Sequence, residues 1–203
     1  MKKRAPSPRG PTRRECALGL LASAAGLSVA GAALADDEGV PIDLQMKLLV
    51  KVAGYDKNLP KRAGEQVNIA VYRKKDDGVS AGVAEQAVRA LGEHGEVAGL
   101  KAAAFALDFS SASDVKSAVA TRRLAIVYFA PGLTRKEVEE LAVTLEGVSV
   151  LSATFEPTDV PRGLVLGFDV VSGKPKILVN LGQAKKQDVA LSADLLKLAK
   201  VYE

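Results

Sequence analysis

The run 124–130 constrains the fold more than any other part of the chain. Its seven residues, LAIVYFA, include no charged side chain, and Pro131-Gly132 follows directly. An apolar run of this length, rich in β-branched and aromatic residues, is typical of a strand that is covered on both faces. We therefore expect 124–130 to be a central strand of a parallel sheet, with helices packed on either side.

The sequence around this run alternates between strand and helix patterns. Apolar and β-branched residues predict strands at 66–72, 100–107 and 148–155, and helical spacing predicts helices at 42–55, 80–93, 113–122 and 134–147. We expect Ser80 and Thr134 to cap two of these helices, with Glu137 completing a capping box. The polar stretch 59–65 is expected to be a link. Helices between successive strands indicate parallel crossover connections.

The C-terminal part departs from this alternation. Residues 164–171 and 176–181 have the pattern of two strands joined by a tight turn at Ser172-Gly173, and 192–201 has the spacing of an amphipathic helix. The predicted fold class is α/β, with three layers: a mostly parallel sheet of about four strands, flanking helices and an antiparallel C-terminal hairpin. We place this hairpin at a sheet edge, where strands can pair with another chain, so a homodimer is also considered.

The first 35 residues have the composition of an export signal. Six Lys or Arg residues precede the uncharged segment 17–35, which ends in Ala33-Leu34-Ala35. This order predicts a signal peptide cleaved after Ala35, and a retained membrane anchor is the alternative. The pair Arg13-Arg14 favours twin-arginine export, although paired arginines also occur in general secretory signals. We therefore predict one α/β domain at 36–203, located in the periplasm.

Charge and residue counts exclude several classes of function. The whole chain has a net charge of +4, but residues 36–203 carry 22 Lys or Arg and 23 Asp or Glu. This balance argues against nucleic-acid binding, which depends on clustered cations. One Cys and one His exclude a disulfide framework and a zinc site built from several such ligands. The single thiol, Cys16, lies within the predicted signal.

No residue pattern in 36–203 is typical of an enzyme. His94 lies in Glu93-His94-Gly95-Glu96, where we expect a solvated residue at a helix end, and the carboxylates Asp108 and Asp159 are far apart in the sequence. Neither glycine-rich phosphate-binding pattern occurs. We therefore expect no catalysis, no cofactor and no metal. One alternative stays open, because Asp108 and Ser110-Ser111 follow a predicted strand, where open α/β sheets bind ligands.

The segment after the first helix is the candidate partner contact. It contains Tyr55, Asp56, Asn58 and Leu59. An exposed aromatic side chain can supply much of the binding energy of an interface. The alternative is that Tyr55 fixes the helix to the sheet. Near the other end of the chain, we expect Asn180 to satisfy backbone groups where the last strand ends.

The C-terminal sequence carries a family resemblance. The stretch 177–184, ILVNLGQA, is followed by 189–199, VALSADLLKLA. A strand ending in Asn-Leu, a short helix and a Ser-x-x-Leu-Leu-x-Leu-Ala helix resemble the ending of the YfiR-like family. The opening helix around 45–51 and the apolar strand 124–130 match that family's order of elements. The segment 53–60 differs from the Phe-x-x-Phe-x-x-Trp-Pro pattern found in many members.

The resemblance implies a periplasmic regulator rather than an enzyme. The family includes a protein that restrains a membrane-bound diguanylate cyclase by binding its periplasmic portion. By this resemblance, we expect the chain to bind an envelope or inner-membrane signalling protein. The alternative is a periplasmic domain that binds a small-molecule solute, similar to one lobe of a solute-binding protein.

Overall fold

The computed structural model describes residues 39–203. Arg13, Arg14, Ala33 and Ala35, which carry the export and cleavage predictions, lie outside the described residues. Those predictions therefore stay predictions. Within residues 39–203, no helix is both long enough and apolar enough to cross a membrane.

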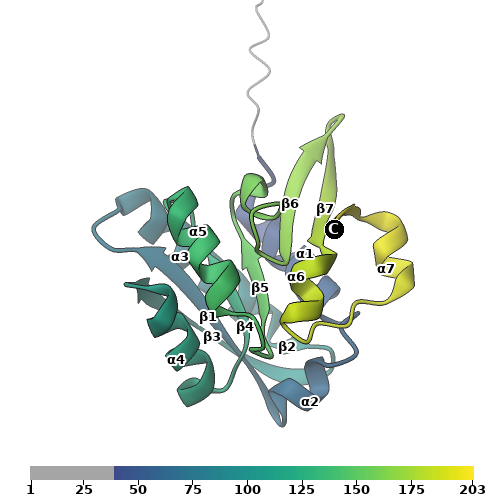
Figure 1. Cartoon of the computed structure of the whole chain (residues 1–203), viewed down its shortest axis with the longest axis horizontal. Coiled ribbons are helices and arrows are strands. Elements are labelled where there is room, and N and C mark those ends of the chain that lie inside the picture. The colour runs from purple at the N-terminus through teal and green to yellow at the C-terminus, as the bar shows by residue number, and fades with distance from the viewer. Residues whose placement is uncertain (1–38) are drawn as a thin grey trace, which may run out of the picture. The chain divides into compact units, whose positions relative to one another are not determined.

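An eight-stranded sheet forms the centre of the described structure (Figure 1). Its strands are β1 (Gln66–Lys74), β2 (Glu96–Val97), β3 (Leu100–Phe109), β4 (Leu124–Phe129), β5 (Leu151–Thr154), β6 (Leu166–Val171), β7 (Lys174–Asn180) and β8 (Lys200–Tyr202). Their spatial order is β2-β3-β1-β4-β5-β6-β7-β8. The run from β3 to β6 is parallel, β7 is antiparallel to β6, and β2 is antiparallel to β3. This arrangement confirms the predicted fold class, with five parallel strands in that run rather than four.

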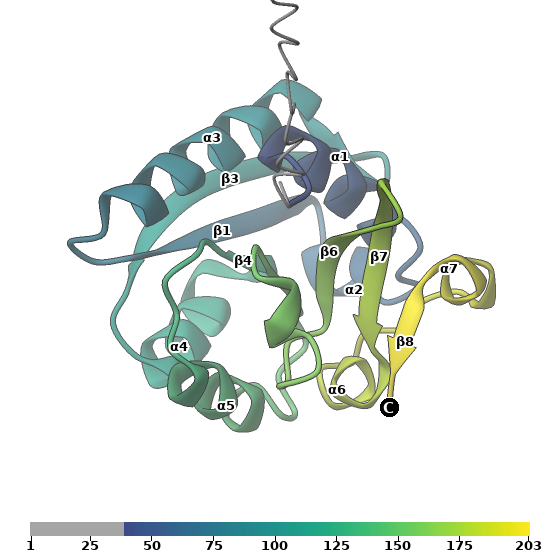
Figure 2. The same cartoon turned by 90° about the horizontal axis from the view of Figure 1, so that it is seen from above.

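Helices cover both faces of this sheet. They are α1 (Ile42–Ala53), α2 (Leu59–Ala63), α3 (Gly78–His94), α4 (Ala112–Arg122), α5 (Arg135–Thr144), α6 (Leu181–Lys186) and α7 (Ala193–Leu198), with a 3₁₀ turn η1 at Pro157–Asp159. Figure 2 shows α1 and α3 on one side of β1, β3 and β4, and α4 and α5 on the other. The predicted three-layer architecture is therefore present.

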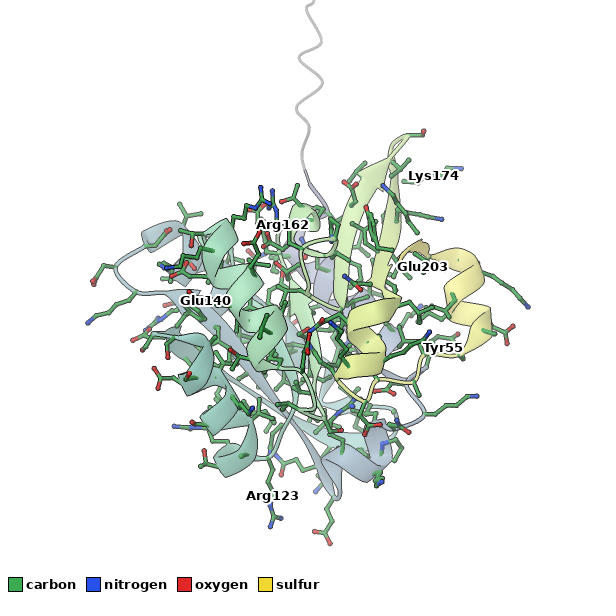
Figure 3. All side chains as sticks on the ribbon, viewed as in Figure 1. Tyr55, Arg123, Glu140, Arg162, Lys174 and Glu203 are labelled. Carbon is green, nitrogen blue, oxygen red and sulfur yellow. The ribbon has the colours of Figure 1, made fainter. Side chains whose placement is uncertain are left out.

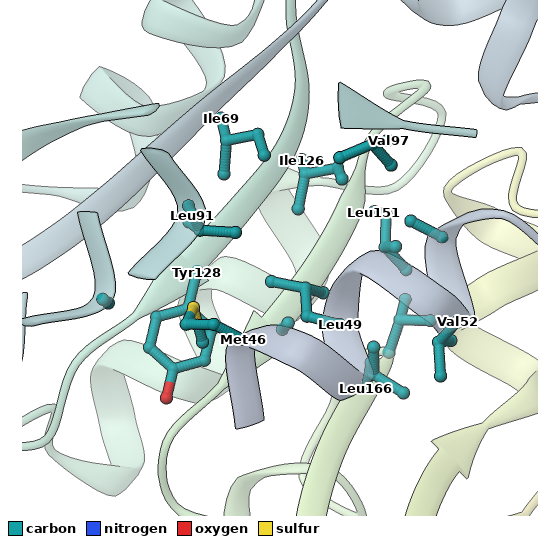
Figure 4. Close-up of a cluster of buried hydrophobic side chains, with 14 of the residues drawn as sticks. Met46, Leu49, Val52, Ile69, Leu91, Val97, Ile126, Tyr128, Leu151 and Leu166 are labelled. Atoms are coloured by element: carbon teal, nitrogen blue, oxygen red, sulfur yellow. The ribbon is translucent and has the colours of Figure 1, made fainter. Parts of the chain in front are cut away.

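The strand β4 shows why the run 124–130 is apolar throughout. Ile126 and Tyr128 pack in the core beneath α1 and α3, whereas Val127 and Phe129 pack in the second core beneath α4 and α5. Figure 4 shows Tyr128 beside Met46 of α1, with Ile126 in the same cluster near Val97. A strand with both faces buried has no position at which a charged side chain reaches water.

One polar group is accommodated inside the first core. The Tyr128 hydroxyl donates a hydrogen bond to Gln45 Oε1 at 2.8 Å, and Gln45 Nε2 donates to the Val40 carbonyl at 2.8 Å. Burial raises the pKa of Tyr128 well above its usual value, and the nearby Glu156 charge adds to this effect. The phenol therefore stays neutral and acts as a hydrogen-bond donor.

The starts of two predicted elements were wrong. The stretch 59–65 is not wholly a link, because Leu59 is completely buried and begins the short helix α2. Asp77, rather than Ser80, caps α3: its carboxylate accepts the Ser80 N–H at 3.0 Å. The Ser80 hydroxyl instead accepts the Lys74 N–H at 2.8 Å and joins the end of β1 to the first turn of α3. The predicted Thr134–Glu137 capping box is confirmed.

The prediction for the chain end was also wrong. The last helix stops at Leu198, and Lys200–Tyr202 form β8, which pairs in parallel with Leu178–Asn180. The hairpin β6–β7 therefore lies inside the sheet, and β8 forms its edge. The physical reason is that β7 presents unpaired backbone groups on its outer side, and pairing with the chain end satisfies them.

Candidate functional site

The carboxyl edge of the parallel strands is a candidate ligand site. After β1 the chain first adds β3 on one side and then β4 on the other, and a crevice between such strands is where open α/β sheets bind ligands. Here Lys74 forms an ion pair with Glu137 across that position. Gly132 (φ +105°) comes so close that an added Cβ would lie 2.9 Å from Asp77 Oδ2. Side chains of the protein itself therefore narrow this crevice, and a cavity of about 330 Å³ lined by Lys74, Asp77 and Asp108 lies beside them.

The polar residues near this edge are paired with each other. Arg73 Nε donates to Asp108 Oδ1 at 2.7 Å. Ser111 caps α4 by accepting the Asp114 N–H at 3.1 Å, and its hydroxyl donates to the Asp114 carboxylate at 2.8 Å. Asp108 is thus an ion-pair partner, and Ser111 is a helix cap. These contacts give both residues a structural role, whereas the sequence had left ligand binding open as an alternative.

The other titratable residues considered from the sequence do not form a cluster with Asp108 and Ser111. His94 is exposed at the end of α3, as predicted. Within residues 39–203, no group of three or more His, Cys, Asp or Glu side chains is placed to hold a metal ion.

A pair of acidic residues follows β5. Asp159 is 4% exposed, accepts a hydrogen bond from Thr154 Oγ1 at 3.2 Å and forms an ion pair with Arg162 at 3.2 Å. Burial raises its pKa despite these partners. Burial also raises the pKa of Glu156, and the Asp159 charge adds to the rise. Asn180 Nδ2 donates to the Val160 carbonyl at 2.9 Å, which confirms the predicted structural role of Asn180 next to this turn.

The segment Tyr55–Leu59 is divided between surface and interior. Leu59 is completely buried and Asp56 is 3% exposed, whereas Tyr55 is 49% exposed. Asn58 is half-buried, and its Nδ2 donates to Asp188 Oδ1 at 2.8 Å. Of the four predicted partner-contact residues, Tyr55 is therefore the one with a large free surface.

Asp56 holds this segment to the C-terminal part of the chain. Its Oδ1 accepts the backbone N–H of Asn58 at 3.0 Å and that of Ala190 at 2.9 Å, and its Oδ2 forms an ion pair with Arg62. Both side chains of the ion pair are buried, at 0% and 3% exposure. This network fixes the position from which Tyr55 projects.

Tyr55 lies beside the start of α7, the helix that precedes the edge strand β8. The Ser192 N–H donates to the Tyr55 carbonyl at 3.1 Å, which joins this residue to the start of α7, and Figure 3 shows Tyr55 next to that helix. Two further large apolar side chains of this region are exposed, Leu198 at 66% and Val201 at 38%. We call Tyr55, Leu198 and Val201 the C-terminal apolar residues. Sequence reasoning missed both residues because it placed Leu198 on the inward face of the last helix and extended that helix to Val201, whereas Leu198 is exposed on α7 and Val201 lies in β8.

Comparison with known proteins decides the family. A sequence profile described as YfiR/HmsC-like matches residues 42–200, which is most of the chain. The chain belongs to the YfiR/HmsC-like family. Membership supports a periplasmic regulatory role in general terms, because regulators of this family act with membrane signalling proteins. No curated protein matches the sequence significantly.

Solved structures show that the YfiR/HmsC-like fold is shared more widely. A Streptococcus pneumoniae ABC domain in complex with L-Trp has 13% identity and a TM-score of 0.53, over 79% of this chain and 61% of its own. A conserved domain protein of Vibrio cholerae has 13% identity and a TM-score of 0.56, over 80% and 60%. A ligand-free, open substrate-binding protein of Clostridium difficile with adhesive properties has 13% identity and a TM-score of 0.55, over 81% and 60%. The chain thus spans about three fifths of each of these structures, and the likeness is one of fold.

Proposed function

We propose that this protein is exported to the periplasm and there restrains an envelope signalling protein, such as a membrane diguanylate cyclase, by binding it rather than by catalysis. The observation that carries the proposal is membership of the YfiR/HmsC-like family over residues 42–200. The side-chain pairing at the carboxyl edge of the sheet supports a non-enzymatic role, since Lys74, Glu137 and Asp108 are engaged with each other or with Arg73.

The C-terminal apolar residues are the proposed contact. Tyr55 is next to the buried Asp56, whose contacts fix the backbone of this segment, so little backbone entropy is lost when a partner binds the exposed ring. The strand β8 lies at the end of the spatial order, so its outer edge is open within the described residues. An open edge can accept a strand from a partner, with neighbouring apolar side chains supplying specificity. The same edge would be used if two copies of the chain form a homodimer.

Capture of the partner tests this proposal. The tagged protein is crosslinked under mild conditions in its native envelope, and the captured membrane proteins are identified. Tyr55→Ala and Leu198→Lys should each weaken binding by about 2 kcal/mol or roughly thirtyfold, the size of a typical hot-spot loss. Val143→Lys on α5 is the matched control, because Val143 is exposed to a similar degree, 70%, but lies on another helix. Equal capture by all three variants would exclude this edge as the contact.

A small-molecule binding role is the second candidate function. Two of the structurally similar proteins are described by a bound amino acid or as substrate-binding, and this chain matches about three fifths of each. A thermal-shift screen of the purified protein with metabolites tests this candidate, because a ligand that binds the folded state raises the melting temperature. The absence of any shift, together with successful partner capture, would favour the regulatory role alone.

A further inference from the structure

One cavity of the described structure lies away from the carboxyl edge, at the start of β4. It has a volume of about 600 Å³, and its wall includes Lys61 and Arg62 of α2, Lys116 and Arg123 at α4, and the loop 147–149 after α5. Cavities of this size suit a small organic molecule. These elements are far apart in the sequence, so the cavity is a product of the tertiary fold.

The wall of this cavity is rich in positive charge. Lys61, Lys116 and Arg123 are exposed, and none of them forms an ion pair within residues 39–203. The one acidic residue of the wall is Asp188. Its two carboxylate oxygens accept hydrogen bonds from Asn58 at 2.8 Å and from Ser149 at 3.0 Å. Asp188 is thus held by neutral donors. The three positive charges of Lys61, Lys116 and Arg123 exceed its single negative charge, so the wall is positively charged overall.

A buried donor of the same wall has no acceptor. The Arg62 side chain is 3% exposed, its Nη2 is paired with Asp56, and its Nη1 donates to the Asp188 carbonyl at 3.3 Å. Its Nε is buried and has no hydrogen-bond partner. A buried N–H without an acceptor costs about 1–3 kcal/mol. Because this Nε is not accessible to solvent, it adds positive charge behind the wall and is not itself a contact for a ligand.

The floor of the cavity is apolar. Val119 and Leu124 are 7% and 2% exposed, and the half-buried Val148 joins them in the wall. The site therefore combines a cationic rim with an apolar base. An inorganic ion would use the rim but leave this base in contact with water.

Stabilisation of helix ends explains the position of only some of the cations around this cavity. The last turns of α2 and α4 contribute to the wall, and cations near a helix carboxyl end are stabilised by its partial negative charge. That effect falls off within the last turn. Lys116 lies in the first half of α4 and is therefore outside its range, although it lines the same cavity as Arg123.

We propose that this cavity binds a small organic anion, a phosphate or carboxylate group carried on an apolar body, with the anionic group at Lys61, Lys116 and Arg123 and the body on Val119, Leu124 and Val148. The proposal deepens the second candidate function, because it names a site and a ligand class. It does not depend on the regulatory role, which uses a different part of the surface.

Titration calorimetry of the purified protein tests the proposal with four probes. Phenyl phosphate and benzoate carry the two anionic groups on an apolar ring, benzyl alcohol carries the ring without charge, and inorganic phosphate carries the charge without a ring. We expect saturable binding of at least one aromatic anion, weakened by added salt. We expect much weaker binding of benzyl alcohol and of inorganic phosphate.

Three variants locate the binding. Arg123→Gln and Lys116→Gln should each reduce affinity about tenfold, the loss expected for a charge-assisted contact. Ala120→Glu adds a negative charge at an exposed position of the wall and should reduce it further. Lys174→Gln, at the far tip of the β6–β7 hairpin (Figure 3), is the matched control and should bind as the parent protein does.

Three results would overturn the proposal. They are no saturable binding of either aromatic anion at millimolar concentration, equal affinity in Arg123→Gln and Lys174→Gln, or inorganic phosphate binding as tightly as phenyl phosphate. The last result would mean a simple anion site without a role for the apolar base. A shift with other metabolites in the separate thermal screen would then still support small-molecule binding at another place.

Discussion

Removal of the Asp56 carboxylate is the sharpest test of how this fold is held together. The change Asp56→Ala leaves the Arg62 guanidinium, 3% exposed, without its counter-charge. It also leaves the N–H groups of Asn58 and Ala190 without their acceptor. Breaking a buried ion pair from one side costs about 3–5 kcal/mol, because an uncompensated charge stays inside. We expect a loss of stability of that order.

The expected loss converts into a measurable shift. For a domain of this size, 1 kcal/mol corresponds to about 2–4 °C in melting temperature, so Asp56→Ala should lower it by about 6–20 °C. Thermal unfolding followed by circular dichroism measures the melting temperature, and urea unfolding measures the free energy of unfolding. Asp56→Asn keeps an oxygen acceptor for the two N–H groups and should lose less.

A double-mutant cycle separates the ion pair from the backbone contacts. Arg62→Met removes the buried charge while keeping most of the side-chain volume. The double variant Asp56→Ala/Arg62→Met should be more stable than Asp56→Ala alone, because no unpaired charge is then left inside. A loss below about 1 kcal/mol in Asp56→Ala, or strictly additive effects in the cycle, would refute the reasoning.

Three further predictions follow from particular residues. Gly163→Ala should destabilise the protein by about 2–5 kcal/mol in urea unfolding, because φ is +129° there and an added Cβ would lie 2.2 Å from Ala142 Cβ. Gly82→Ala is the control: Gly82 lies in α3 with open space around it, so this change should stabilise the protein by about 1 kcal/mol. Glu156→Gln should raise the free energy of unfolding at neutral pH more than near pH 4, because the pKa of Glu156 is raised in the folded state. The stability linked to the protonated carboxyl is then complete below the unfolded pKa and is lost as pH rises through the folded pKa. A gain in stability that is independent of pH would contradict this sign. N-terminal sequencing of the exported protein should begin at Asp36, and Arg13→Lys/Arg14→Lys should block export; an intact leader on the exported protein would show that it is retained.

The surface predictions depended on tertiary contacts that the sequence does not display. Asp56 and Leu59 lie in the segment predicted to contact a partner, yet both are buried: the Asp56 carboxylate accepts the Ala190 N–H, and Leu59 packs in the first core. Tyr55 kept a large free surface because α7 lies beside it rather than over it. The sequence offered no signal for the cavity at Lys61 and Arg123, since these residues meet only when α2 packs near the end of α4.

The architecture was readable from local patterns. The charge-free run 124–130 required burial on both faces, and a strand with two buried faces requires helices on each side, so the three-layer α/β fold followed from β4 and its neighbours. The capping box at Thr134 marked a helix start in the same local way. These features depend on hydrogen bonds and burial patterns within a few residues, which the sequence encodes directly.

Only the tertiary structure decided how the chain ends and which groups reach the surface. The residues around Val201 have helical spacing with those before them, but the unpaired edge of β7 draws Lys200–Tyr202 into a strand. Backbone pairing and burial between distant segments depend on which surfaces the fold brings together. A local pattern cannot specify them, because the same residues satisfy their hydrogen bonds in either conformation.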